Sequence, residues 1–167
     1  MQKSVVVLLF FLCLVGQANG QTKKKVLATV SMIADMASQI AGDKLIVDCI
    51  VPIGGDPHLY DPIPADARKA ARADLVLKNG LTFEGWLSEL IDNSGTKGKQ
   101  VLVTTGVTSI QSLTYANSAD PHAWMNVANG LIYIKNIYQA IVELDPENEN
   151  FYTERYREYK AQLEYLD

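Results

Sequence analysis

The sequence predicts an α/β protein in which helices cover both faces of a parallel β-sheet. Short apolar runs alternate along the chain with longer runs whose apolar residues recur at helical spacing. Strands that alternate with helices are typical of βαβ units, which build parallel sheets between helical layers. Hydrophobic residues make up 48% of the chain, enough to form a buried core, so a disordered chain is not expected.

The first two-thirds of the chain contains this alternation. The four predicted strands are residues 26–30, 45–51, 74–78 and 101–103. The helices predicted between them are residues 32–41, 65–73 and 83–91. Because residues 45–51 are rich in β-branched side chains, we expect that strand to be buried on both faces. Cys49 lies inside it and is expected to be a small buried hydrophobe.

The last third of the chain is predicted to be helical, after a long connection at residues 104–121. Helical spacing predicts helices at residues 128–144 and 151–166, with an Asp-Pro pair between them. The second helix carries an apolar stripe that includes three tyrosines, Tyr152, Tyr156 and Tyr159. The stripe continues to the last residues without a helix-stop signal, so we expect the sequence to stop inside an element.

Residues 1–20 have the features of a secretory signal peptide. Lys3 precedes an apolar run at residues 5–15, and small and polar residues follow before Gln21. The run is shorter than the about 20 residues that span a bilayer, so we expect export and cleavage. Cys13 lies inside the run behind bulky residues, so a lipid anchor is not expected. The exported chain then keeps one cysteine, Cys49, which excludes an internal disulfide.

The charge of the exported chain excludes one class of partner. Removing residues 1–20 leaves 14 bases, 19 acids and a formal charge of −5. Nucleic-acid binding requires a basic footprint, so no nucleic-acid partner is expected. The remaining length suits one domain of about 100–200 residues.

A repeated Asp-Pro-His triplet, at residues 56–58 and 120–122, holds both histidines of the chain. The proline before each histidine stiffens the backbone, which suits a metal ligand whose geometry must be held closely. Each triplet lies in a loop that follows a predicted strand, and ligands of parallel sheets bind beyond the carboxyl ends of strands. We therefore expect His58 and His122 to meet at one sheet edge and to bind a metal ion.

Two histidines do not complete a metal site, because zinc takes at least three protein ligands even in catalytic sites. The carboxylates that could add ligands are Asp56, Asp61, Glu84 and Asp120. Asp56 and Asp120 are expected to brace their own loops, as aspartate before proline does in turns. Glu84 has two possible roles: it hydrogen-bonds a ligand histidine, or it is an acid near a helix N-terminus.

Several stretches together resemble the periplasmic and cell-surface solute-binding proteins that serve zinc and manganese ABC transporters. The two loops containing Asp-Pro-His, in this order and with ADLVLKNG between them, make the resemblance specific. The matching stretches are 26–42 (VLATVSMIADMASQIAG), 54–62 (GGDPHLYDP), 73–80 (ADLVLKNG), 81–87 (LTFEGWL) and 120–126 (DPHAWMN).

This resemblance implies a fold of two α/β lobes joined by a long helix, with the metal between the lobes. His58 and His122 match the two N-terminal-lobe ligands, and a second lobe would supply the others. Residues 1–20 would then be the signal peptide, 21–146 the N-terminal metal-binding lobe and 147–167 the start of the linking helix, with the C-terminal lobe absent. Such a protein is a periplasmic monomer that delivers its metal ion to a membrane permease. Zinc and manganese are the expected cargo, and ferrous iron stays open.

Two other functions stay open on the residues themselves. A surface adhesin of the same fold could use the tyrosine stripe as a contact face. A metal-dependent hydrolase would need a general base near the metal-bound water, and Glu84 is the one candidate. The sequence has no nucleophile elbow, phosphate loop or carboxylate dyad, so we expect a binding protein and not an enzyme.

Overall fold

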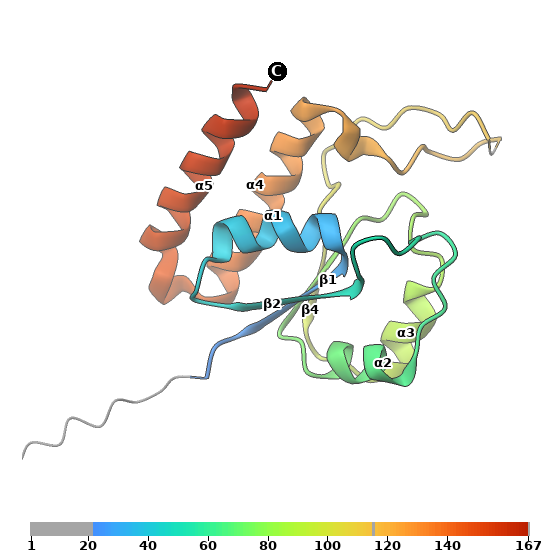
Figure 1. Ribbon diagram of the computed structural model, residues 1–167, viewed down its shortest axis with the longest axis horizontal. Coiled ribbons are helices and arrows are strands. Elements are labelled where there is room, and N and C mark those ends of the chain that lie inside the picture. The colour runs from blue at the N-terminus through green and yellow to red at the C-terminus, as the bar shows by residue number, and fades with distance from the viewer. Residues whose placement is uncertain (1–21, 115, 167) are drawn as a thin grey trace, which may run out of the picture.

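The computed structural model describes residues 22–114 and 116–166 (Figure 1). Four strands form one parallel sheet in the order β2-β1-β3-β4. The strands are β1 Lys25–Val30, β2 Ile46–Val51, β3 Leu75–Lys78 and β4 Lys99–Leu102. The predicted fold class and all four predicted strands are confirmed, with small differences at their ends. The predicted signal peptide, including Cys13, lies outside the described residues.

Helices cover both faces of this sheet. They are α1 Ser31–Ala41, α2 Pro64–Ala71, α3 Leu87–Ser94, α4 Val127–Leu144 and α5 Glu149–Glu164, with short 3₁₀ turns η1 Ala123–Met125 and η2 Pro146–Asn148. The chain moves outward from β1 to β2 and then crosses back to β3, so right-handed crossovers place α1 and α2 on opposite faces. In Figure 1, α1, α4 and α5 lie together on one side and α2 and α3 on the other.

The core lies between the central strands and the layer formed by α1 and α4. Strands β1 and β3 are buried through most of their length because both have a strand on each side and a helix on each face. The helices contribute isoleucines that are fully buried, Ile33, Ile40, Ile134, Ile137 and Ile141. Burying each such side chain contributes about 1.5–3 kcal/mol, so this layer contributes much of the stability of the fold.

The prediction that residues 45–51 are buried on both faces is wrong. Strand β2 is an edge strand, and Ile46 keeps 47% of its surface exposed. Cys49 is half-buried, and burial followed by the charge of Asp48 raises the pKa of its thiol. The β-branched composition predicted a strand correctly, but exposure depends on the strand order, which composition does not encode.

The third predicted helix begins later than expected. Residues 79–86, which we call the Asn79–Trp86 turn, form turns before α3 begins at Leu87. Leu81 and Thr82 both adopt positive φ, at 52° and 65°, which is costly for residues with a side chain. Such conformations persist where surrounding contacts hold them, and the contacts of this turn lead to the histidines.

The tyrosine stripe of α5 faces inward. Tyr152 is fully buried, and its hydroxyl donates a hydrogen bond of 2.5 Å to Asp145 Oδ2. The ring of Tyr156 stacks on Tyr138 of α4 with 4.5 Å between centroids, and Tyr159 is half-buried. The tyrosines therefore pack α5 against the neighbouring helices α1 and α4. They do not form the exposed contact face that the adhesin hypothesis requires.

In the described part of the chain, no helix has the length and apolarity needed to cross a membrane.

Candidate metal site

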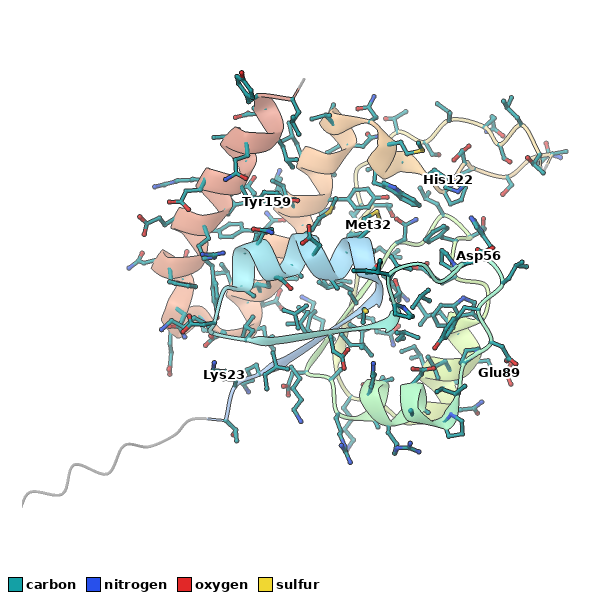
Figure 2. All side chains as sticks on the ribbon, in the orientation of Figure 1. Lys23, Met32, Asp56, Glu89, His122 and Tyr159 are labelled. Atoms are coloured by element: carbon teal, nitrogen blue, oxygen red, sulfur yellow. The ribbon has the colours of Figure 1, made fainter. Side chains whose placement is uncertain are left out.

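The two histidines meet at the carboxyl edge of the sheet, as the sequence predicts. His58 lies in the loop after β2 and His122 in the connection after β4, 64 residues apart. Their Nε2 atoms are 3.2 Å apart, and both side chains are exposed to solvent. Figure 2 shows His122 and Asp56 on the same side of the molecule, at the opposite end from Lys23.

The separation of the two Nε2 atoms suits a pair of metal ligands. Two imidazoles bound to tetrahedral zinc at about 2.0–2.1 Å place their nitrogens about 3.3 Å apart. Ligands at a right angle in an octahedral site, with bonds of about 2.2 Å, lie about 3.1 Å apart. The observed 3.2 Å lies between these values, and it also allows an imidazole–imidazole hydrogen bond. The pair can therefore exchange one hydrogen bond for a shared metal ion with little movement.

Asp120 sets the orientation of His122. Its Oδ1 atom lies 2.8 Å from the imidazole Nδ1 and 2.8 Å from the backbone nitrogen of His122. The backbone N–H and then the imidazole lower the pKa of the Asp120 carboxyl, which keeps it ionised and able to accept both hydrogen bonds. With the Nδ1 proton donated to Asp120, the lone pair of His122 is on Nε2, which faces His58. A carboxylate that fixes a ligand histidine in this way is common in metal sites.

His58 is held by its loop and not by a carboxylate on its ring. Asp56 Oδ1 accepts a hydrogen bond of 2.9 Å from the backbone N–H of His58. Further along the loop, the hydroxyl of Tyr60 donates to Asp66 Oδ2 at 2.8 Å. Burial and then this hydrogen bond raise the pKa of Tyr60 to about 12, so the hydroxyl stays protonated. The prediction that Asp56 and Asp120 brace their own loops is confirmed, with an additional role for Asp120.

The ring of Phe83 lies against both imidazoles. Its centroid is 4.8 Å from that of His58 and 5.9 Å from that of His122, both edge-to-face. Phe83 is 3% exposed and also contacts Trp124, which packs against His122 at 5.3 Å. The buried ring of Phe83 therefore limits the rotation of both imidazoles and forms an apolar surface beneath the candidate site.

The Asn79–Trp86 turn, to which Phe83 belongs, also hydrogen-bonds the backbone just before each histidine. Trp86 Nε1 donates a hydrogen bond of 2.8 Å to the carbonyl of Pro57, and Asn79 Nδ2 donates one of 3.0 Å to that of Pro121. Both bonds come from the Asn79–Trp86 turn, so a single element fixes the two loops relative to each other. We did not predict this from the sequence, which shows the Asn-Gly turn and the nearby aromatics but not their targets.

Glu84 anchors this turn. Its carboxylate is buried and accepts hydrogen bonds from the Thr29 hydroxyl at 2.6 Å, the Asn79 N–H at 2.7 Å and the Gly80 N–H at 2.9 Å. The side chain of Asn79 continues the network, because its Oδ1 accepts from the hydroxyl of Tyr133 at 2.6 Å. Burial and then the charge of Glu84 raise the pKa of Tyr133, so that hydroxyl remains a donor. Glu84 accepts its hydrogen bonds from Thr29 and from this turn and not from a histidine, so the first role predicted for it is wrong. It does lie near a helix N-terminus, three residues before α3 begins at Leu87.

Among the described residues, His58 and His122 are the two candidate ligands that lie together. Across residues 22–114 and 116–166, no group of three or more His, Cys, Asp or Glu side chains is arranged to hold a metal ion. Asp56 and Asp120 are committed to their own loops and Glu84 to the turn. Asp61, the fourth candidate, is exposed in the loop after His58 and joins no such group. A metal ion bound by this pair would therefore need further ligands from elsewhere.

The contrast between the two aspartates gives a testable prediction. Asp120→Ala and Asp56→Ala each remove one bond to a histidine backbone N–H, but only Asp120→Ala also frees an imidazole. We expect Asp120→Ala to weaken metal binding by the full-length protein by about 10–100-fold. Asp56→Ala should weaken it by less than about 10-fold. Calorimetric titration measures both, with thermal unfolding as a check that the variants fold alike. Equal losses of affinity would show that Asp120 acts through its loop alone.

A family model for the zinc-uptake complex component A, periplasmic (ZnuA), matches residues 26–167. The chain belongs to the ZnuA family. This match includes both Asp-Pro-His loops and the turn between them. Members of this family are solute-binding proteins and not enzymes, so the hydrolase hypothesis is dropped. In the structure, the carboxylate of Glu84 accepts three hydrogen bonds from within the protein.

Three relatives illustrate the range within the family. The manganese ABC transporter substrate-binding lipoprotein PsaA of Streptococcus anginosus is 39% identical over 98% of this chain and 57% of its own length. The iron ABC transporter substrate-binding lipoprotein MtsA of Streptococcus pyogenes serotype M1 is 42% identical over 87% and 49%. The Mn-bound periplasmic metal binding protein from Candidatus Liberibacter asiaticus has a TM-score of 0.79 and 38% identity, over 84% of this chain and 53% of its own.

The chain spans about half the length of the curated relatives it matches. The same fold therefore serves proteins named for manganese and for iron, and the metal is not decided by membership of the family. Both curated relatives are named lipoproteins, so they do not support our prediction that this chain lacks a lipid anchor.

Proposed function

We propose that this chain is part of an extracytoplasmic protein that captures a divalent transition-metal ion and delivers it to the membrane permease of an ABC transporter. The observation that carries the proposal is the convergence of His58 and His122, with Nε2 atoms 3.2 Å apart on a braced, exposed edge. Family membership supports the role, because relatives are named as ABC transporter substrate-binding proteins.

The remaining ligands, in this proposal, belong to a second lobe of the whole protein. The described residues contribute two nitrogens, whereas zinc and manganese sites take four or more ligands. The relatives are about twice as long as the matching stretch, which leaves room for a lobe that closes over the histidine edge. Enclosure between two braced half-sites would require little movement of either histidine.

A pair of imidazole ligands is compatible with zinc, manganese and ferrous iron, so all three are candidate cargo. Imidazole suits zinc and iron, while manganese favours additional oxygen ligands, so the second half of the sphere decides the preference. We propose zinc or manganese as the cargo, with iron as the alternative that the MtsA relative suggests. The ion is the transported substrate and is released at the permease.

Calorimetric titration of the full-length protein with each of the three metals tests this proposal. We expect one ion bound per protein and an affinity that falls as the pH is lowered, because protons compete with metal for the imidazole nitrogens. No uptake of any of the three metals, or an affinity that is flat from neutral to clearly acid pH, would contradict it.

The attachment to the membrane is a separate question. We propose export to the periplasm through residues 1–20 with cleavage before Gln21. Intact-mass measurement of the exported protein distinguishes this from a lipoprotein. A mass that starts at Gln21 supports cleavage, whereas a diacylglyceryl mass on Cys13 would place this chain with its lipoprotein relatives.

A further inference from the structure

Six exposed bases gather at the amino edge of the sheet, opposite the histidines. We call this set the basic edge; it consists of Lys23, Lys24, Lys25, Lys44, Arg68 and Arg72. Among the described residues none of the six forms an ion pair, whereas Lys69, Lys99 and Lys160 do. In an exported chain with a formal charge of −5, such a concentration of free positive charge requires an explanation.

The acids on this side do not neutralise it. Asp48 is paired with Lys69 at 3.1 Å, and Asp74 accepts a hydrogen bond of 2.8 Å from the backbone N–H of Lys25. Asp145 is bound to the hydroxyl of Tyr152, and Asp43 is the remaining exposed acid beside Lys23 and Lys24. Hydrogen bonds from uncharged donors leave the charges of Asp74 and Asp145 in place. The six bases and Lys69 nevertheless outnumber the four acids of this side, Asp43, Asp48, Asp74 and Asp145.

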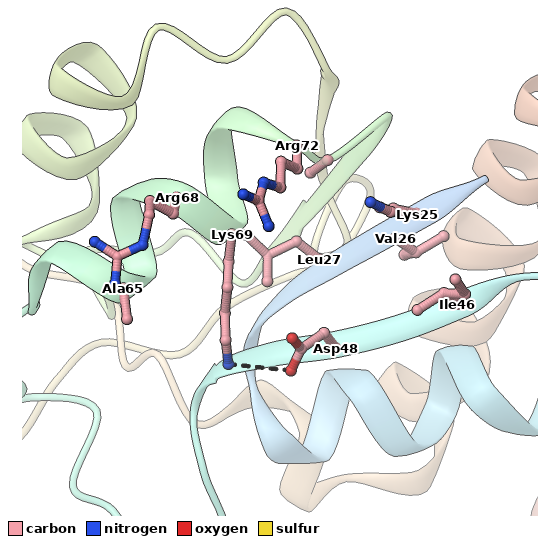
Figure 3. A pocket seen from close by; sticks show the side chains of 10 residues that line it. Lys25, Val26, Leu27, Ile46, Asp48, Ala65, Arg68, Lys69 and Arg72 are labelled. Carbon is pink, nitrogen blue, oxygen red and sulfur yellow. Dashed lines mark hydrogen bonds and ion pairs between the residues drawn. The ribbon is translucent and has the colours of Figure 1, made fainter. Parts of the chain in front are cut away.

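A groove between α2, the start of β1 and the edge strand β2 contains three of the bases (Figure 3). It has a volume of about 320 Å³, and Lys25, Arg68 and Arg72 line it. Ile46, which is 47% exposed, gives the groove an apolar wall, and the Asp48–Lys69 ion pair also lines it. Arginine forks bind phosphate oxygens well, and the apolar wall suits the hydrocarbon next to a phosphate. The groove thus resembles a site for an amphiphilic anion more than one for a free ion.

The position of the basic edge in the molecule determines how the protein would be oriented on a surface. Lys23, Lys24 and Lys25 lie eight to ten residues after the apolar run at residues 5–15, so the basic edge includes some of the described residues nearest in sequence to the proposed signal peptide. Figure 2 shows Lys23 at the far end of the molecule from His122. A surface bound through the basic edge would therefore leave the metal edge facing away from it and open.

We propose that the basic edge docks on an anionic phospholipid bilayer, with phosphate headgroups in the groove beside Arg68 and Arg72. The attraction is electrostatic and weak per residue, so it needs the six bases together and acts within about 10 Å at 0.1 M salt. It would keep the protein beside the membrane that holds its permease while the histidine edge collects metal. This role goes beyond metal capture and does not depend on it.

Vesicle co-sedimentation of the exported full-length protein tests this. Vesicles of phosphatidylcholine with phosphatidylglycerol are compared with vesicles of phosphatidylcholine alone, at low and high salt. We expect binding to the anionic vesicles that Arg68→Gln/Arg72→Gln weakens by about 25-fold, at roughly five-fold per base. Lys135→Gln/Arg157→Gln removes the same charge from exposed positions on α4 and α5 and should change binding little.

Each outcome supports or overturns the proposal. Selective loss in the Arg68/Arg72 variant, together with weaker binding at high salt, supports it. Equal losses in both double variants would reduce the effect to net charge and overturn it. Equal binding to both kinds of vesicle would show an apolar anchor acting without the basic edge. No binding to either kind of vesicle would also overturn it. Unchanged metal affinity in the same variants separates this test from that of the proposed function.

Discussion

Glu84→Ala is expected to destabilise the protein by about 3–4 kcal/mol. The substitution leaves two buried donors without an acceptor, the Thr29 hydroxyl and the backbone N–H of Asn79, and one partly buried donor, the backbone N–H of Gly80. Each unsatisfied buried donor costs about 1–3 kcal/mol. The strained turn that Glu84 holds would relax, and total stabilities are about 5–15 kcal/mol, so the loss is a large part of the total. Denaturant unfolding measures it.

Glu89→Ala is the matched control for this prediction. Glu89 is an exposed glutamate on the adjacent helix α3, and its removal should cost no more than about 0.5 kcal/mol. A Glu84→Ala variant as stable as the Glu89→Ala variant would show that the turn is held by other contacts. We also expect Glu84→Ala to weaken metal binding, because the same turn fixes both histidine loops through Asn79 and Trp86.

Replacing either histidine is expected to have the largest effect on function. His58→Ala or His122→Ala in the full-length protein should weaken metal binding by at least about 100-fold. That is at or beyond the upper end of the about 10–100-fold loss typical of a supporting residue, because a ligand itself is removed. Both side chains are exposed, so neither substitution should change the free energy of unfolding by much in the absence of metal. Metal titration and denaturant unfolding together separate the two effects.

Leu59→Ala gives a control in the same loop, since Leu59 is 82% exposed and directly follows His58. It should retain the affinity of the unmodified protein. If Leu59→Ala lowered the affinity as much as His58→Ala, the histidine would act by shaping its loop and not by binding metal.

The parts of the fold that local patterns determine could be predicted from the sequence. Apolar runs and helical spacing located all four strands and the helices α1, α2, α4 and α5, because each of these buries its own regular face. The exposure of β2 could not be predicted, since it follows from the strand order. The late start of α3 depends on Glu84 reaching Thr29, a contact across 55 residues that no local pattern reports.

Part of the candidate site could likewise be predicted from the sequence and part could not. His58 and His122 could be predicted to meet, because loops after parallel strands gather at one sheet edge. The residues that hold the two histidine loops in place could not be predicted. Phe83, Asn79 and Trp86 belong to one short turn, whereas the groups that they contact lie in two distant loops. The contact of Asp120 with the imidazole depends on a side-chain rotation that distinguishes two otherwise identical triplets.

His58 and His122 are expected to bind one metal ion through their Nε2 atoms. Nitrogen NMR of the full-length protein with ¹⁵N-labelled histidine tests it directly, with signals assigned from His58→Ala and His122→Ala. On addition of one equivalent of zinc we predict that the Nε2 signals of both residues shift to the metal-bound range. We also predict that Nδ1 of His122 stays protonated against Asp120. Zinc bound with both Nε2 signals unchanged, or bound through Nδ1 of either residue, would contradict the account.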